Sequence, residues 1–326
     1  MRTQSRPLLA VCCLVSLGVS VCNAQNAGQP KPDKAAEVAP AYAASVPKPT
    51  LAEVRYGEHE RHVLDFWQAK SDTPTPLVFV IHGGGWTGGS KERLDRFADV
   101  PALLQAGISV VAINYRLIPQ AVAAGIEPPV RAPLHDAARA LQFVRSKAKE
   151  WNLDPERIGA AGGSAGACTS LWLAYHDDLA DPASEDPIAR ESSRLAAVAV
   201  RAPQTSLDPQ QMREWTPNSC YGGHAFGLKS FDSFLAAREE ILPWIQAYSP
   251  YALVSADAPP VCLFYAGPPA LGEDQTDPTH SANFGVALRE RCTALGVTCH
   301  VAYPEAPEMP YATPAAFLIA TLTSSD

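Results

Sequence analysis

Two glycine-rich runs in this sequence have residue types suited to nucleophilic chemistry. The first, Gly162-Gly163-Ser164-Ala165-Gly166, follows the strand-like run Ile158–Ala161 and precedes an apolar stretch with helical spacing. Small residues on both sides of a serine permit the sharp strand-to-helix turn that exposes its hydroxyl group. Ser164 is therefore the candidate nucleophile. A serine hydroxyl also needs a base and a site that stabilises the developing oxyanion.

The second run, His82-Gly83-Gly84-Gly85-Trp86, is suited to binding that oxyanion. It follows a buried apolar run, and glycines let backbone N–H groups approach a substrate oxygen closely. The amides of Gly83, Gly84 and Ala165 are the candidate donors. His82 is expected to shape this loop rather than to transfer protons.

The elements that must position these runs alternate along the chain. Apolar and β-branched runs predict strands at Val63–Trp67, Leu77–Ile81, Ile108–Ile113, Leu195–Val200, Val261–Tyr265 and Thr298–Tyr303. Helical spacing predicts helices at Arg93–Ala106, Asp136–Lys149, Ala165–Tyr175, Phe284–Leu295 and Pro314–Leu322. Such alternation predicts an α/β fold with a mostly parallel sheet and helices on both faces. Residues 206–256, rich in aromatics, interrupt the alternation and are expected to form a cap over the active-site mouth.

Together with three further motifs, the two glycine-rich runs resemble the α/β-hydrolase superfamily. The further motifs are Asn114–Leu117, Asp136–Ala140 and Asp154–Ile158, and the resemblance covers essentially all of residues 53–326. It is strongest to the esterase/lipase branch related to hormone-sensitive lipase and bacterial ferulic-type esterases. The resemblance implies hydrolysis of carboxylic esters, short-chain acyl or acetylated-carbohydrate substrates, and no cofactor.

The resemblance also implies that an acidic residue follows the strand ending near Tyr265. Asp277 is the first choice because Asp277-Pro278 precedes a predicted helix, as the acid of this family often does. Asp274 is the alternative. Either residue also fits a solvated loop carboxylate or a helix cap.

The base departs from the family pattern. Where relatives have a run that ends in histidine after the last strand, this chain reads Tyr303-Pro-Glu-Ala-Pro-Glu308, so Glu308 takes that position. A carboxylate with a reference pKa of about 4.3 is a poor base for a serine hydroxyl. His280 is the other candidate base, although a polar residue at a helix start is the favoured interpretation of it. The missing histidine leaves a second function open, a catalytically inactive protein that binds a ligand beneath the cap.

The N-terminus predicts export. Residues 1–24 have arginines, an apolar stretch and a small residue at the end, which is typical of a cleavable signal peptide. A secreted or periplasmic location follows, and a lipid anchor on Cys22 is less favoured because Val21 is unsuited to the preceding position. Residues 25–52, rich in Pro, Ala and Lys, are expected to be a flexible leader, with one large domain over 53–326. No later segment is long and apolar enough to span a membrane.

Charge and cysteine content indicate which binding partners, metal sites and disulfides to expect. Acidic side chains outnumber basic ones by 34 to 26, for a formal net charge of −8, which disfavours nucleic acid as a partner. A small-molecule ester is the expected partner, and no Cys/His spacing indicates a metal site. Cys292 and Cys299 are the favoured disulfide pair, with buried free thiols as the alternative.

Overall fold

The computed structural model describes residues 41–307 and 309–324. Eight strands form one sheet in the order β1-β2-β4-β3-β5-β6-β7-β8. β1 and β2 pair antiparallel, as do β2 and β4, and every later pairing is parallel. The strands are β1 (Leu51–Arg55), β2 (Val63–Trp67), β3 (Thr75–Ile81), β4 (Ser109–Ile113), β5 (Leu153–Gly163), β6 (Ala197–Arg201), β7 (Val261–Phe264) and β8 (Cys299–Ala302).

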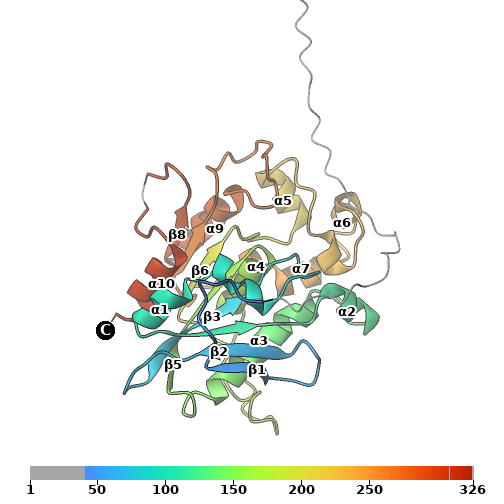
Figure 1. The fold of residues 1–326 in the computed structure, drawn as a ribbon. Coiled ribbons are helices and arrows are strands. Elements are labelled where there is room, and N and C mark those ends of the chain that lie inside the picture. The colour runs from blue at the N-terminus through green and yellow to red at the C-terminus, as the bar shows by residue number, and fades with distance from the viewer. Residues whose placement is uncertain (1–40, 308, 325–326) are drawn as a thin grey trace, which may run out of the picture. The chain divides into compact units, whose positions relative to one another are not determined.

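Helices cover both faces of this sheet (Figure 1). The described helices are η1 (Lys91–Arg96), α1 (Val100–Gln105), α2 (Ile118–Ala123), α3 (Arg131–Ser146), α4 (Ala165–Tyr175), α5 (Pro209–Trp215), η2 (Gly223–Phe226), α6 (Phe231–Ala236), α7 (Leu242–Tyr248), α8 (Pro250–Leu253), α9 (Asn283–Ala294) and α10 (Pro314–Leu322). Apolar residues of α3, α4 and α9 pack on one face of the sheet, and those of α1 and α10 pack on the other. The expected mostly parallel sheet between two helical layers is confirmed.

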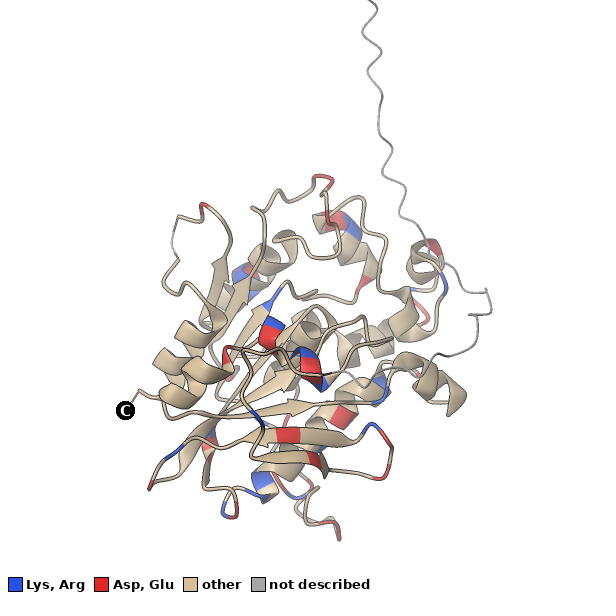
Figure 2. Ribbon diagram, viewed as in Figure 1, with Lys and Arg blue, Asp and Glu red and all other residues tan. Residues whose placement is uncertain are grey.

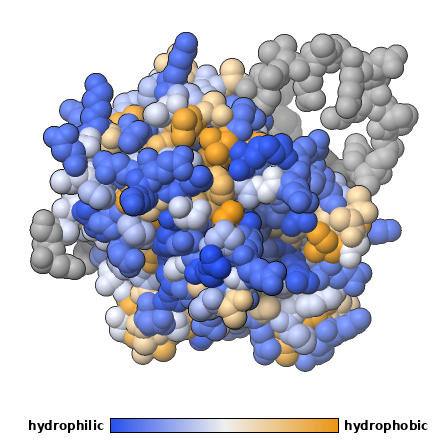
Figure 3. Space-filling model, turned by 90° about the horizontal axis from the view of Figure 1, so that it is seen from below, coloured by the Kyte–Doolittle hydropathy of each residue, from blue (hydrophilic) through white to orange (hydrophobic). Residues whose placement is uncertain are grey.

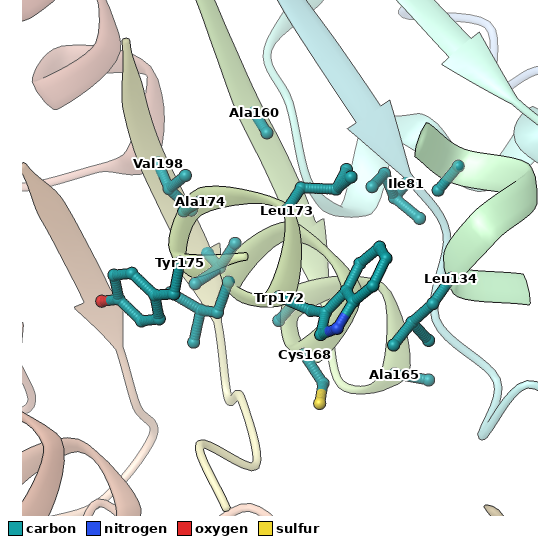
Figure 4. Packing of buried hydrophobic residues seen from close by; sticks show 14 of the residues in the cluster. Ile81, Leu134, Ala160, Ala165, Cys168, Trp172, Leu173, Ala174, Tyr175 and Val198 are labelled. Atoms are coloured by element: carbon teal, nitrogen blue, oxygen red, sulfur yellow. The ribbon is translucent and has the colours of Figure 1, made fainter. Parts of the chain in front are cut away.

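The larger of these two layers centres on α4, which is buried along its whole length. In Figure 4, Trp172 extends from α4 toward Leu134 of α3 and Ile81 of β3, and Tyr175 lies on the other side of the helix. Burying side chains of this size contributes about 1.5–3 kcal/mol each. This packing anchors the helix whose first residue follows Ser164.

One helix predicted from the sequence corresponds to two shorter helices in the structure. The segment Arg93–Ala106 is divided between the 3-10 helix η1 and helix α1. The Asp99 side chain accepts a hydrogen bond from the Ala102 N–H and so caps a new helix, and Pro101 lies in its first turn. A proline and a capping aspartate are start signals, so they break the segment where periodicity alone predicted continuity.

The described end of the expected leader also differs from the prediction. The Tyr42 hydroxyl donates to Asp65 at 2.6 Å, and its ring packs edge-on against Trp67. The Thr50 N–H donates to the carbonyl of Phe66 before β1 begins. Residues 41–52 therefore contact the sheet. The expected signal peptide, Cys22 and the leader up to residue 40 lie outside the described residues.

The proposed disulfide between Cys292 and Cys299 is not formed, because both residues are free cysteines. They lie together as thiols, and a hydrogen bond to Cys292, together with burial, raises the pKa of Cys299 well above its usual value. Both are free thiols, as in the alternative interpretation, with Cys292 buried and Cys299 partly buried.

Charged residues are interspersed along the chain rather than collected in one block (Figure 2). The face seen in Figure 3 is mostly hydrophilic, with smaller groups of apolar residues between. Among the described residues, none of the helices has the length and apolar character needed to cross a bilayer.

Candidate active site

Ser164 lies between β5 and α4 in a strained backbone conformation. Its φ of 53° and ψ of −120° fall in a region that non-glycine residues rarely adopt. The neighbouring chain is so close that a Cβ on Gly166 would overlap the carbonyl oxygens of Ile81 and His82. The small residue expected at position 166 is therefore a steric requirement of the turn that presents Ser164.

His280 lies within hydrogen-bond distance of this serine. Its Nε2 is 3.0 Å from Ser164 Oγ, and its Nδ1 is 2.8 Å from Asp277 Oδ2. An ionised carboxylate can only accept, so Nδ1–H must donate to Asp277, which leaves Nε2 free to accept from the Ser164 hydroxyl. The arrangement orients a neutral imidazole as a base for the serine.

The acid and the base occupy one tight turn, Asp277-Pro278-Thr279-His280. While Asp277 Oδ2 accepts from the imidazole, Oδ1 accepts from the backbone N–H groups of Thr279 and His280, each at 3.2 Å. The buried Gln204, in the segment after β6, donates its side-chain N–H to the Thr279 carbonyl at 2.6 Å. The turn is thus held from within by Asp277 and from the body of the protein by Gln204.

This pair is partly open to solvent, since the side chains of His280 and Asp277 are 34% and 61% exposed. Solvent screening weakens a charge pair at such exposure. The role of Asp277 is therefore mainly geometric, because it holds the ring in one tautomer and one orientation.

The loop after β3 lies directly against the serine turn. A Cβ on Gly83 would lie 2.6 Å from the carbonyl oxygen of Gly163 and 3.5 Å from the Cβ of Ser164. Gly84 has a φ of 111°, which glycine adopts without strain. Within the described part of the chain, the N–H groups of Gly83, Gly84 and Ala165 donate to no other protein group. Three free donors beside an exposed hydroxyl are suited to stabilising an oxyanion.

His82 holds this loop through a hydrogen bond and a stacked ring. Its ring stacks on Tyr115 with centroids 4.2 Å apart, and its Nδ1–H donates to the Gly83 carbonyl at 2.8 Å. Arg61 donates to Nε2, which fixes the tautomer. Burial lowers the pKa of His82 to about 3, although the bond to Gly83 acts in the opposite direction. His82 is thus a neutral structural residue, in line with the sequence interpretation.

The segment 206–256 contacts both loops of the site. His224 donates its Nε2–H to the Gly85 carbonyl at 2.9 Å. The Asn218 side chain donates to the Gln275 carbonyl, and the Trp215 carbonyl accepts from Gly272, both in the loop that carries Asp277. The segment therefore contacts the loop of the glycine donors, through His224, and the loop that carries His280.

Of the two candidate bases, His280 is in contact with Ser164, and Glu308 lies outside the described residues. Asp277, the first choice for the acid, contacts His280, whereas among the described residues the side chain of the alternative Asp274 has no contact with it. The spacing of three residues around Pro278 was the available signal, because a turn brings its first and fourth residues together. His300 packs against Tyr311, away from this constellation.

No group of three or more His, Cys, Asp or Glu side chains in residues 41–307 and 309–324 is arranged to hold a metal ion.

Comparison with known proteins identifies relatives with this arrangement of elements. The family model described as BD-FAE matches residues 64–269, more than half of the chain. Carboxylesterase NlhH of Mycobacterium tuberculosis is 36% identical over 109 residues, which cover 33% of this chain and 32% of the relative. Esterase LipQ of the same species is 25% identical over 270 residues, which cover 80% of this chain and 56% of the relative. The match to NlhH spans about a third of that protein's length.

Solved structures share the fold. The acetyl ester-xyloside bifunctional hydrolase from Caldicellulosiruptor lactoaceticus aligns with a TM-score of 0.57 and 22% identity, over 80% of this chain and 87% of the other. A truncated carbohydrate esterase from gut microbiota aligns with a TM-score of 0.59 and 20% identity, over 81% and 90%. At these identities the comparison establishes a common fold.

Proposed function

Because the chain belongs to the BD-FAE family of α/β-hydrolases, we propose that it hydrolyses carboxylic esters through an acyl-enzyme on Ser164. The observation that carries the proposal is the hydrogen-bonded series from Ser164 through His280 to Asp277. The free amides of the neighbouring glycine loop support it, because they stand where a carbonyl oxygen would become negative.

Acylation begins when Ser164 Oγ attacks the ester carbonyl carbon and its proton passes to His280 Nε2. The C–O π bond opens, and the oxygen takes the negative charge beside the amides of Gly83, Gly84 and Ala165. Asp277 stabilises the imidazolium that forms. When the intermediate collapses, the bond to the alcohol breaks and His280 returns its proton to the leaving alkoxide.

Deacylation repeats these steps with water. A water molecule gives a proton to His280 Nε2 and its oxygen attacks the acyl carbon. Collapse then breaks the bond to Ser164 Oγ, which recovers the proton from His280. The carboxylic acid leaves, and no cofactor enters the balance.

Short-chain acyl esters or acetylated carbohydrates are the proposed substrates. A cavity of about 440 Å³ borders Asp277 and His280, which is the size range of small-molecule sites. The segment 206–256 is proposed to act as a cap that shapes access to this region, since it contacts both loops of the site.

The inactive ligand-binding alternative depended on a missing histidine. His280 at 3.0 Å from the serine hydroxyl removes that reason. No other observation on the described residues favours a silent protein, so catalysis is the function proposed.

A serine-reactive probe tests the proposal. The parent protein is expected to be labelled by a fluorophosphonate and to hydrolyse p-nitrophenyl acetate. Ser164→Ala and His280→Ala should each lower kcat by about 10³-fold or more, because the nucleophile and its base act as a unit. Retained folding is checked by circular dichroism.

Glu308→Gln distinguishes the two candidate bases. This variant is expected to keep its activity within about 2-fold, since a role in proton transfer would cost about 10²-fold or more. A parent protein that the probe does not label would contradict the enzyme proposal. If Glu308→Gln were inactive and His280→Ala remained active, Glu308 rather than His280 would be the base.

We also propose that the protein is exported. The features of residues 1–24 support a cleavable signal peptide and a secreted or periplasmic location. Mass spectrometry of the N-terminus of the exported protein tests this. Cleavage after Ala24 is expected, and a lipid-modified Cys22 at the N-terminus would contradict it.

A further inference from the structure

Arg201 is an exposed cation at the carboxyl end of β6. In the described part of the chain, its guanidinium group forms no hydrogen bond or ion pair. Some other arginines are paired, for example Arg116 with Asp136 and Arg238 with Asp208. The Arg201 side chain therefore retains its full hydrogen-bonding capacity.

This residue is adjacent to the nucleophile. Its backbone carbonyl accepts a hydrogen bond from the Ser164 N–H at 3.0 Å, and it pairs with Gly163 in the sheet. The chain then turns at Ala202, whose φ of 49° is rare for a residue with a side chain. Arg201 and Ser164 thus end neighbouring strands at the same edge of the sheet.

A cavity of about 400 Å³ lies in front of Arg201. It is lined by the ends of β6, β7 and β8 and by the following segment, including Phe264, Tyr303 and Met309, and Arg201 is its one charged residue among those described. The cavity shares Ala202 and Ala266 with the cavity that borders Asp277 and His280. A molecule that occupied both cavities would contact Arg201 and His280.

Arg201 also lines a second depression, of about 350 Å³, with Asp95, Arg96 and Asp99. There two carboxylates balance the two arginines, whereas in the cavity toward Tyr303 the positive charge of Arg201 is not balanced by any described lining residue. The charges therefore direct an anionic group to the side that adjoins the catalytic base.

We propose that Arg201 binds a carboxylate carried by the ester substrate. A guanidinium group presents two parallel N–H donors that match the two oxygens of a carboxylate. The net charge of −8 makes the protein as a whole unfavourable to anions, so an unpaired arginine beside the site provides a local attraction. This inference rests on the proposed esterase function and adds an anionic ester as its substrate class.

Paired substrates test the proposal on both sides of the ester bond. Mono-4-nitrophenyl adipate and 4-nitrophenyl hexanoate have acyl chains of equal length, with and without a carboxylate. 4-Acetoxybenzoate and its methyl ester differ in the same way in the alcohol part. Arg201→Gln should lower kcat/KM for at least one anionic probe by about 10- to 100-fold, mainly through KM, and change the neutral probes less than about 2-fold.

Arg96→Gln is the matched control, since Arg96 is an exposed arginine of the neighbouring depression and does not line the proposed cavity. It should leave all four probes unchanged. Equal losses on charged and neutral probes in Arg201→Gln, or no loss on either, would overturn the proposal.

Binding without turnover separates this inference from the esterase proposal. Calorimetry of adipate and of 4-hydroxybenzoate is carried out on Ser164→Ala with and without Arg201→Gln. Weaker binding of either anion in the double variant supports the carboxylate site even if no ester is hydrolysed. Equal binding of both anions would overturn it. A parent protein that hydrolyses none of the probes would contradict only the esterase proposal.

Discussion

At the level of single residues, Gly83 has almost no room for a side chain. A Cβ there would lie 2.6 Å from the Gly163 carbonyl, at the turn that carries the nucleophile. The same residue supplies one of the proposed oxyanion donors. A side chain at position 83 would therefore also affect the donor. Any backbone shift that relieved the contact with the Gly163 carbonyl would move the Gly83 N–H group.

Gly83→Ala is expected to lower kcat for p-nitrophenyl acetate by about 10²-fold, which is the typical cost of losing one oxyanion donor. Overpacking should also cost about 1–3 kcal/mol of stability. Gly88→Ala is the control in the same loop, because its added Cβ would contact nothing within 4 Å. Steady-state kinetics and thermal unfolding of both variants check this. Equal activity in the two variants would refute the steric argument.

At the level of elements, parallel strands bring the parts of the site to one edge of the sheet. The loop of Gly83 and Gly84 follows β3, the turn of Ser164 follows β5, and the turn of Asp277 and His280 lies in the segment between β7 and α9. Ligand sites in parallel sheets form at this edge because all carboxyl ends meet there. The acid–base turn also needs an anchor, and Gln204 provides it through the Thr279 carbonyl.

Gln204→Leu is expected to reduce kcat by about 10-fold or more with little change in KM, because a small displacement of the imidazole impairs proton transfer. Gln142→Leu is the matched control. That glutamine is also buried and donates to backbone carbonyls, but those belong to Leu179, Ala189 and Glu191. Gln142→Leu should lose stability alone. If both variants lose activity equally, Gln204 has only a structural role.

At the level of the whole molecule, buried histidines link stability to pH. Burial lowers the pKa of His82 to about 3 and that of His135 to about 4, where the nearby Arg131 acts in the same direction. The unfolded chain binds these protons near pH 6.5, and the folded chain binds them only near the lowered values. Their contribution to stability is therefore complete above about pH 6.5 and is lost as the pH falls toward 3.

The lowered pKa of His82 alone should reduce the free energy of unfolding by about 2 kcal/mol as the pH falls from 6.5 to 5, at up to about 1.4 kcal/mol per pH unit. Guanidinium unfolding at several pH values checks this. His82→Asn keeps polar groups but does not titrate, so its stability should be lower at pH 7 and should change less toward pH 5. An unchanged slope in this variant would contradict the assignment.

The sequence by itself determined the features that depend on neighbours along the chain. β-Branched runs identified the strands, as in Val63–Trp67 and Leu77–Ile81, because alternation and burial are local patterns. The glycine runs identified Ser164 and the loop of Gly83, because close backbone contacts require residues without side chains. Asp277 was also within reach of sequence reasoning.

Only the tertiary structure brings His280 to Ser164. Ser164 and His280 are 116 positions apart, and their contact depends on a turn held by Gln204 from the segment after β6. Sequence reasoning left Glu308 and His280 as the two candidate bases, because no local pattern records how a loop folds back over a sheet. A hydrogen bond between distant residues is set by the packing of the loops that carry them, and packing is a property of the assembled sheet.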